Sequence, residues 1–162
     1  MTEDLPLAGL PGILGNLRDA TLALWGIPPD ATLRLINVSE NETYLIKAPA
    51  FKTILRLHRT GYHSNRAIEC ELVWSAALAR DAGIITPVAI AGRDGALIQT
   101  VTLDGLPPRY AVLFEFIEGT HPNEDQDLAP AFEALGALAT RTHRHSADWQ
   151  RPEPFERLTW DL

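Results

Sequence analysis

The segment Thr53-Ile-Leu-Arg-Leu-His58 is a short apolar run with one arginine in its middle. Successive side chains of a strand point to opposite faces, so Leu55 and Leu57 are expected on one face. Ile54, Arg56 and His58 would share the other face. We therefore predict a strand that buries one side and presents a guanidinium group on the other.

Outward from this strand, the sequence alternates between strand-like and helical patterns. Two further runs rich in β-branched and apolar residues precede it, separated by polar or proline-containing turns. Ser64 is a helix-capping residue type and Gly83 a typical helix stop, so we expect a helix between them. The expected elements, in order, are a helix over 14–24, strands over 33–38, 44–48 and 53–58, a helix over 65–82, strands over 87–90, 96–101 and 110–117, a polar linker over 121–127, and a helix over 128–143.

This order predicts an α+β fold with a five- to six-stranded antiparallel sheet and one packed helix. A short helix precedes the sheet, and a hinge with the first helix of an incomplete second lobe follows it. We place the boundary at the polar linker: residues 1–118 form an N-terminal lobe, and residues 119–162 form the hinge linker and the start of a truncated C-terminal lobe.

Composition restricts the classes of function. The formal charge of −7, with acidic and basic residues interspersed, argues against a surface for nucleic acid or anionic membranes. Cys70 is the sole cysteine, which excludes an internal disulfide and a multi-cysteine metal centre. The acidic N-terminus lacks a secretion signal, and no apolar run has the length of a membrane span. We expect a soluble, cytoplasmic protein.

Arg56 is the first candidate for chemistry. A guanidinium group binds phosphate oxygens through a planar fork and stays charged at any relevant pH. The helix over 65–82 offers two carboxylates that could fix it. Glu71 follows the core-facing Ile68 by three residues, and Glu69 is a rival because the register of helix against strand is still open. Arg56 could equally be a surface arginine paired with some acid.

The end of the last expected strand, Glu115-Phe116-Ile117, precedes a glycine and a polar linker. Exposed backbone amide and carbonyl groups there could read the edge of an adenine between apolar walls. Ile54, Ile46 and Phe114 are the candidates for those walls. The alternative is an ordinary core strand.

The turn Ser39-Glu-Asn-Glu42 joins the first two strands. Ser39 and Asn41 could donate hydrogen bonds to phosphate oxygens, whereas Glu40 and Glu42 would repel phosphate unless they turn away. The five histidines have no metal-ligand spacing, and no Gly-x-Ser-x-Gly motif occurs. We assign no metal ligand and no nucleophile.

In order and spacing, these segments resemble the aminoglycoside phosphotransferase family, which includes choline kinase-like enzymes with a protein-kinase-like fold. The resemblance covers about residues 33–144. It rests on Ser39-Glu-Asn-Glu-Thr-Tyr44, Ile54-Leu-Arg-Leu-His-Arg59, Glu71 with Trp74 and Leu78, Thr86-Pro87, Leu113-Phe-Glu-Phe-Ile-Glu-Gly119, Leu135-Gly-Ala-Leu-Ala139 and Thr142-His-Arg144.

The resemblance implies a kinase-like N-terminal lobe that binds ATP. Arg56 would contact the phosphates, Glu71 would hold Arg56, and the backbone of residues 115–117 would bind adenine as the hinge. Mg²⁺ would accompany the nucleotide, with its ligands in the C-terminal lobe. The complete enzyme would transfer the γ-phosphate to a hydroxyl or amine of a small molecule.

The family's His-Gly-Asp catalytic loop and its later Mg²⁺-binding Asp motif have no counterpart here. After His145 the chain has only Asp148 and Asp161, each with different neighbours. We therefore expect the amino-terminal portion of a kinase, inactive alone, that self-associates through the uncovered surface near Phe114, Phe116 and the helix over 128–143. The alternatives are a non-catalytic module that binds nucleotide or protein, and an α+β interaction domain in which Arg56 has no role in nucleotide binding.

Overall fold

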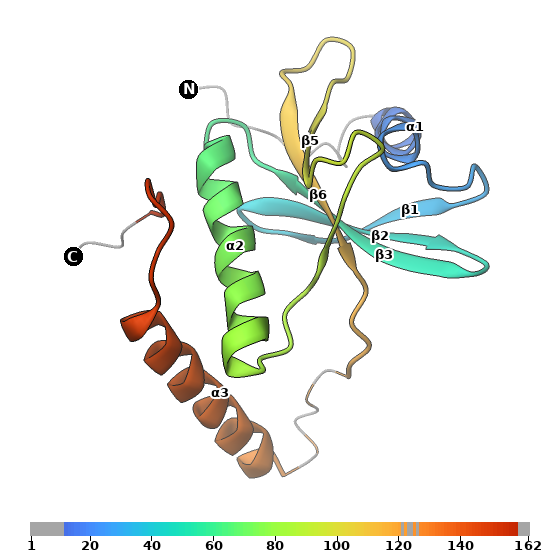
Figure 1. The fold of residues 1–162 in the computed structure, drawn as a ribbon. Helices are drawn as coiled ribbons and strands as arrows, with labels where there is room; N and C mark the ends of the chain where they lie inside the picture. Colours follow the sequence, from blue (N-terminus) through green and yellow to red (C-terminus); the bar gives the residue numbers. More distant parts are fainter. Residues whose placement is uncertain (1–11, 121, 123–124, 126, 159–162) are drawn as a thin grey trace.

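The computed structural model describes residues 12–120, 122, 125 and 127–158. Its centre is a six-stranded antiparallel sheet, as the sequence predicts, with helices on both sides (Figure 1). The elements are α1 (Ile13–Trp25), β1 (Thr32–Val38), β2 (Asn41–Ala48), β3 (Phe51–His58), α2 (Asn65–Ala82), β4 (Ala89–Ile90), β5 (Ile98–Val101), β6 (Arg109–Glu115) and α3 (Ala129–Asp148).

Strand β6 is an interior strand of the sheet and is paired along both edges. The strands follow the order β1-β2-β3-β6-β4, and β5 also pairs with β6. One edge of β6 faces β3, and the other is shared by β5 along its first half and β4 at Leu113 and Phe114. This position explains the continuous apolar run 111–114, because a strand enclosed on both faces buries every side chain.

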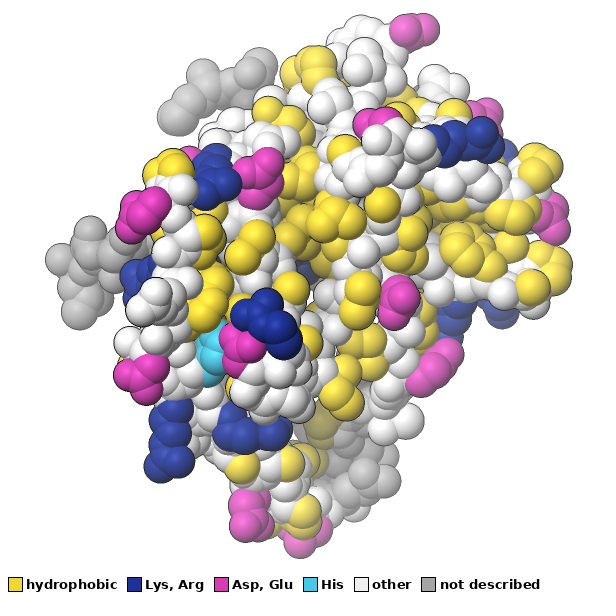
Figure 2. All heavy atoms as spheres, viewed as in Figure 1, with side chains coloured by type: hydrophobic (Ala, Val, Ile, Leu, Met, Phe, Trp, Pro, Cys, Tyr) yellow, Lys and Arg dark blue, Asp and Glu magenta, His cyan; other side chains and the backbone are white. Residues whose placement is uncertain are grey.

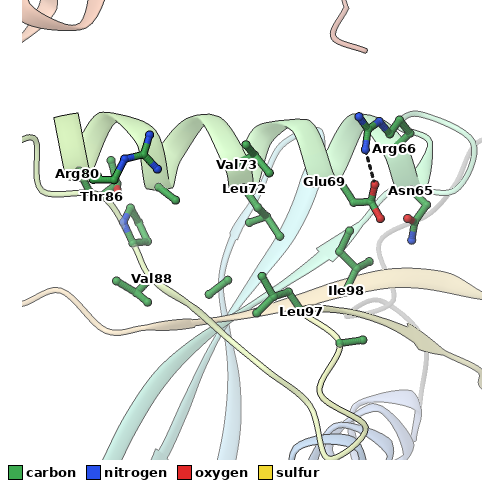
Figure 3. A pocket seen from close by; sticks show the side chains of 15 residues that line it. Asn65, Arg66, Glu69, Leu72, Val73, Arg80, Thr86, Val88, Leu97 and Ile98 are labelled. Atoms are coloured by element: carbon green, nitrogen blue, oxygen red, sulfur yellow. Dashed lines mark hydrogen bonds and ion pairs between the residues drawn. The ribbon is translucent and has the colours of Figure 1, made fainter. Parts of the chain in front are cut away.

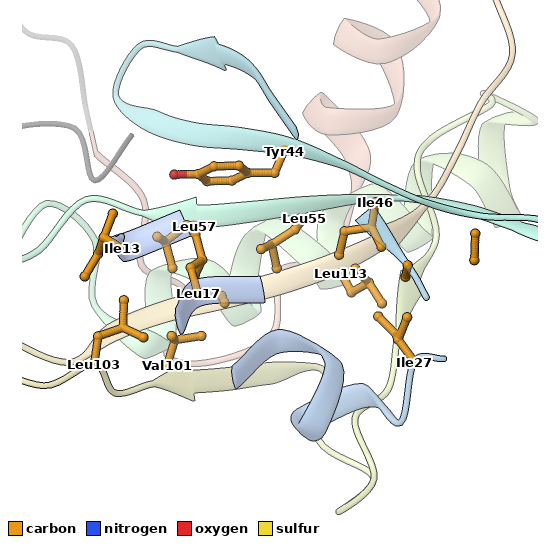
Figure 4. Close-up of a cluster of buried hydrophobic side chains, with 13 residues drawn as sticks. Ile13, Leu17, Ile27, Tyr44, Ile46, Leu55, Leu57, Val101, Leu103 and Leu113 are labelled. Atoms are coloured by element: carbon orange, nitrogen blue, oxygen red, sulfur yellow. The ribbon is translucent and has the colours of Figure 1, made fainter. Parts of the chain in front are cut away.

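Helices α1 and α2 cover opposite faces of the sheet. On the α1 side, Leu17 packs with Leu55 and Leu57 in the larger core cluster (Figure 4). On the α2 side, Ile68 packs with Val112 in a smaller cluster. The alternation expected for β3 is confirmed from Ile54 to Leu57, since Leu55 and Leu57 are fully buried and Ile54 and Arg56 are only partly so. His58, at the end of the strand, is buried as well.

Helix α2 has the predicted ends. The Ser64 hydroxyl accepts a hydrogen bond from the Ala67 amide at 3.0 Å, which caps the first turn. Gly83 ends the helix with φ of 59°, a left-handed conformation that glycine adopts without strain. Helix α3 continues to Asp148, five residues beyond the predicted end at 143.

The strand ends differ more from expectation. The prediction that the last strand continues to Ile117 is wrong, because β6 stops pairing with β3 at the Thr53–Glu115 pair, although β3 itself begins at Phe51. The strand expected over 87–90 is reduced to Ala89–Ile90. Before it, the Thr86 hydroxyl donates to the Ser75 carbonyl at 3.0 Å and ties this segment to α2 instead.

Residues 149–158, called the strap below, follow α3 and return to the first turns of α2. Arg66 donates to the Pro154 carbonyl through Nε at 2.9 Å and Nη2 at 2.6 Å. The Ser64 hydroxyl donates to Glu156 Oε1 at 2.6 Å. The strap is therefore fixed to the helix end that also carries Glu71. In the described ranges, no helix has both the length and the apolar character that a bilayer crossing requires.

Candidate functional site

Arg56 and Glu71 form an ion pair between β3 and α2. Nη1 of Arg56 lies 2.5 Å from Oε1 of Glu71, and both side chains are half-buried. Burial acts to raise the pKa of the Glu71 carboxyl, but the charges of Arg56 and Arg157 outweigh it and hold the pKa below its usual range. Glu71 is therefore an ionised group that fixes the direction of Arg56.

Glu69, the rival partner, points elsewhere. It accepts a hydrogen bond from Nη1 of Arg66 at 3.1 Å and does not contact Arg56. Residues two apart on a helix point about 160° away from each other, so only one of these two glutamates can face β3. The structure brings Arg56 together with Glu71.

Polar groups lie next to Arg56 at the end of the sheet that carries the turn between β1 and β2. Thr43 is the cross-strand partner of Arg56, and Asn41 is the partner of His58. Directly opposed residues of an antiparallel pair lie on the same face. Oδ1 of Asn41 is buried and has no hydrogen-bond partner in the described part of the chain. This end of the face therefore combines a cation with hydroxyl and amide groups.

The other end of the same face is apolar. Ile54 pairs with Leu45 on one side and with Phe114 on the other. The Arg56 guanidinium carbon lies 4.9 Å from the centre of the Phe114 ring, which joins the two ends. The prediction that Ile46 forms a third wall is wrong. Side chains alternate along β2, and Ile46 packs in the core on the α1 side of the sheet.

The segment after β6 offers free backbone groups. The Glu115 amide donates to the Val88 carbonyl at 2.9 Å and is therefore occupied. The amides of Phe116 and Ile117 make no backbone hydrogen bond to any described residue. Nζ of Lys52 lies 3.5 Å from the centre of the Phe116 ring, which holds that ring against β3.

The two acids around the turn before β2, Glu40 and Glu42, differ in burial. Ser39 closes the turn by donating its amide to the Asn41 carbonyl at 3.0 Å, and Glu40 is exposed. Glu42 is buried on the α1 side, where Nη1 of Arg109 lies 2.5 Å from its Oε1. Glu42 therefore does not repel an anion on the face of Arg56.

Two residues beside the Arg56–Glu71 pair were not predicted from the sequence to take part in the site. Arg157 of the strap donates from Nη1 to Oε2 of Glu71 at 3.0 Å. His58 is buried beside Arg56, and neither ring nitrogen has a hydrogen-bond partner among the described residues. Alternation alone could have marked His58, whereas no local signal connects Arg157 to a carboxylate 86 residues earlier.

A groove of about 930 Å³ lies on the other flank of α2, between that helix and the segments around β4 and β5. Leu72, Val73, Val88, Leu97 and Ile98 line it, with the Arg66–Glu69 pair at one end (Figure 3). Hydrophobic side chains gather along this margin of α2 in Figure 2. Neither Arg56 nor Glu71 lines the groove, so it is separate from the polar face of β3.

Metal ligands are a separate question. In residues 12–120, 122, 125 and 127–158, no group of three or more His, Cys, Asp or Glu side chains is arranged to hold a metal ion. We therefore assign no described residue to Mg²⁺.

Comparisons with known proteins place this site in context. The profile of the phosphotransferase enzyme family matches residues 32–162. A comparison with curated proteins gave no match. Among solved structures, a microcompartment-associated aminopropanol kinase is 37% identical with a TM-score of 0.79, over 91% of this chain and 45% of that chain.

Two more distant structures share the fold alone. An amicoumacin kinase in complex with AMP-PNP, Ca²⁺ and Ami is 21% identical with a TM-score of 0.75, over 89% of this chain and 43% of that chain. A spectinomycin phosphotransferase in complex with ADP and spectinomycin is 22% identical with a TM-score of 0.54, over 80% of this chain and 37% of that chain.

The chain therefore spans less than half the length of each of these structures, and its sheet and helices match the N-terminal lobe of kinase-like enzymes. The family that the order of the sequence motifs suggested is confirmed. This chain belongs to the phosphotransferase enzyme family.

Proposed function

We propose that this chain is the ATP-binding N-terminal part of a small-molecule kinase, which transfers the γ-phosphate of ATP to a hydroxyl or amine. The proposal rests on the α2-side face of β3, whose two ends differ in chemical character. A fixed cation with polar neighbours lies at one end, and apolar side chains next to free backbone amides lie at the other.

The nucleotide would lie along this face. Adenine would pack on Ile54 and Phe114 and bind the backbone of Phe116 and Ile117, and the phosphates would reach Arg56. Ile54 and Arg56 are two residues apart on a strand, which corresponds to about 7 Å. That separation allows them to contact different parts of one nucleotide.

The polar neighbours of Arg56 would complete the phosphate site. Thr43 and Asn41 would donate hydrogen bonds from β2, and Ser39 would do so from the turn before it. Glu71 would hold Arg56 in one direction, so that little side-chain entropy is lost when the phosphates bind. Glu115 would contribute through its carbonyl oxygen, since its amide is already bonded.

Mg²⁺ would enter with ATP and neutralise charge on the phosphates. The amicoumacin kinase structure, which contains AMP-PNP and Ca²⁺, supports a nucleotide and a divalent cation as joint ligands of this fold. The three matched structures carry names of small-molecule kinases or phosphotransferases, which supports a small-molecule acceptor.

We further propose residues 1–118 as the nucleotide-binding lobe and residues 119–162 as the hinge linker and the start of a second lobe. The sequence contains no His-Gly-Asp loop, so the group that activates the acceptor would have to come from outside these residues. The chain alone is expected to bind ATP without turning it over.

Calorimetric titration of Mg·ATP into the 162-residue chain tests the proposal. Arg56→Ala should weaken binding at least about tenfold, because one charge-assisted contact to phosphate is lost. Arg80→Ala is the matched control, since Arg80 is exposed on α2 and pairs with its neighbour Asp81. Equal affinities of the wild type and Arg56→Ala would contradict the proposal and favour a module that binds protein instead.

A further inference from the structure

The strap brings a second guanidinium group to Glu71. Oε1 of Glu71 accepts from Arg56 at 2.5 Å, and Oε2 accepts from Arg157 at 3.0 Å. One carboxylate therefore joins cations from two distant parts of the chain, β3 and the strap. Both guanidinium groups are about one-third exposed, so each keeps donors within reach of a ligand.

The charges of this cluster do not cancel. Two guanidinium groups and one carboxylate leave one net positive charge. His58 adds none, because burial and the neighbouring Arg56 keep its imidazole neutral. Glu156, the acid next to Arg157 in sequence, is directed to Ser64 at the start of α2. The cluster is therefore suited to an anion.

Removal of Arg157 would change the cluster in two ways. The charge of Arg56 would be cancelled by Glu71, and the local net charge would fall to zero. Oε2 of Glu71 would also be free to accept a second hydrogen bond from Arg56, and the bidentate pair would withdraw a phosphate donor. Glu71 positions Arg56, and Arg157 thus prevents Glu71 from also cancelling the charge of Arg56.

We propose that Arg157 is the second cation of the phosphate site, supplied by the strap and held in place by Glu71. This inference rests on the proposed function, since the anion it serves is the polyphosphate of ATP. It assigns the strap a direct part in ligand binding, in addition to its packing on α2.

The test compares Arg157→Ala and Arg157→Lys with Arg151→Ala in the 162-residue chain. Arg151 is the matched control, because it lies in the same strap over the Phe155 ring. Affinity for Mg·ATP is measured calorimetrically at low and high salt, and thermal unfolding is recorded for each variant. Arg157→Ala should lose about tenfold in affinity and show a weaker salt dependence. Arg157→Lys, which keeps the charge, should recover most of the loss.

The outcomes separate this inference from the proposed function. If Arg56→Ala loses affinity while Arg157→Ala binds like the wild type, the inference is overturned and the proposed function stands. An equal loss of affinity in Arg151→Ala also overturns it, because the loss would then come from the general charge of the strap. No recovery in Arg157→Lys overturns it as well, because the loss would then come from altered packing of the strap. If the wild-type chain binds no Mg·ATP, both fail.

Discussion

His58 is buried at the end of β3, and its two ring nitrogens lack hydrogen-bond partners within the described ranges. Burial away from water lowers the pKa of its imidazole to about 4, and the positive charge of Arg56 acts in the same direction. The neutral ring therefore belongs to the folded state, and its protonation favours the unfolded chain.

This arrangement predicts a pH-dependent stability. The pKa of His58 is about 4 when folded and 6.5 in the unfolded chain, so the unfolded state binds more protons between these values. The contribution is complete above pH 6.5 and is lost as the pH falls towards 4, by up to about 3 kcal/mol. Urea unfolding between pH 7.5 and 5 should show the loss.

His58→Leu is the matched variant, because leucine has a similar size, tolerates burial and cannot titrate. Its unfolding free energy should change much less over the same range. Glu71 does not confound the comparison, because its lowered pKa confines its own effect to more acidic solutions. An equal slope in the variant and the wild type would show that the acid sensitivity has another origin.

Single residues were predictable where a local pattern marks them. The strand alternation identified the face of Arg56, and the three-residue step from Ile68 favoured Glu71. Residues three apart on a helix differ by only about 60° in direction, so a carboxylate at that spacing stays near the buried side. Arg157 could not be foreseen, since its contact depends on how the strap crosses α2.

At the level of elements, a buried polar network ties β2 to β6 across β3. Glu42 accepts from Nη1 of Arg109 at 2.5 Å and from the Tyr44 hydroxyl at 2.5 Å. Nε of Arg109 donates to the His58 carbonyl at 2.8 Å. Burial and the adjacent Glu42 raise the pKa of Tyr44, so its phenol remains a donor. Every charge in the network is thus paired on the α1 side of the sheet.

We predict that Glu42→Ala lowers the unfolding free energy by about 3 to 5 kcal/mol, because it leaves the Arg109 charge buried without a partner. The double variant Glu42→Ala with Arg109→Ala should lose much less than the sum of the losses in Glu42→Ala and Arg109→Ala alone. Urea unfolding of the wild type, the two single variants and the double variant completes the cycle. Additive losses would mean that the two side chains act independently.

Element boundaries were predictable where side chains define them. Ser64 and Gly83 mark both ends of α2, because capping is a local interaction. The ends of β4 and β6 depend on which strands lie alongside, and those partners are distant in sequence. The Glu42–Arg109 pair was missed for the same reason, since it joins residues 67 positions apart.

For the whole molecule, the sheet is covered on both faces, whereas α3 is not enclosed. None of its described residues is buried, and Phe132, Leu135 and Leu138 are exposed along one stripe. The helix contacts α2 through the Trp74–Ser146 and Asp81–His145 hydrogen bonds. An exposed apolar stripe of this kind is typical of a contact surface.

Self-association through this stripe remains a prediction. The average mass measured by light scattering should rise with protein concentration, because contact between two stripes removes apolar area from water. The double variant Phe132→Ser with Leu135→Ser should stay monomeric, and Glu133→Ser on the same helix should behave like the wild type. A monomer at every concentration would refute the prediction.

An NMR titration of the isotope-labelled chain with Mg·ATP locates the nucleotide, which we propose to lie on the α2 side of β3 with its phosphates at Arg56. We expect the largest amide shifts at Asn41, Thr43, Arg56, Phe116 and Ile117, and no change on the α1 face. Shifts confined to the groove lined by Leu72, Val73 and Leu97, or to α1, would contradict it.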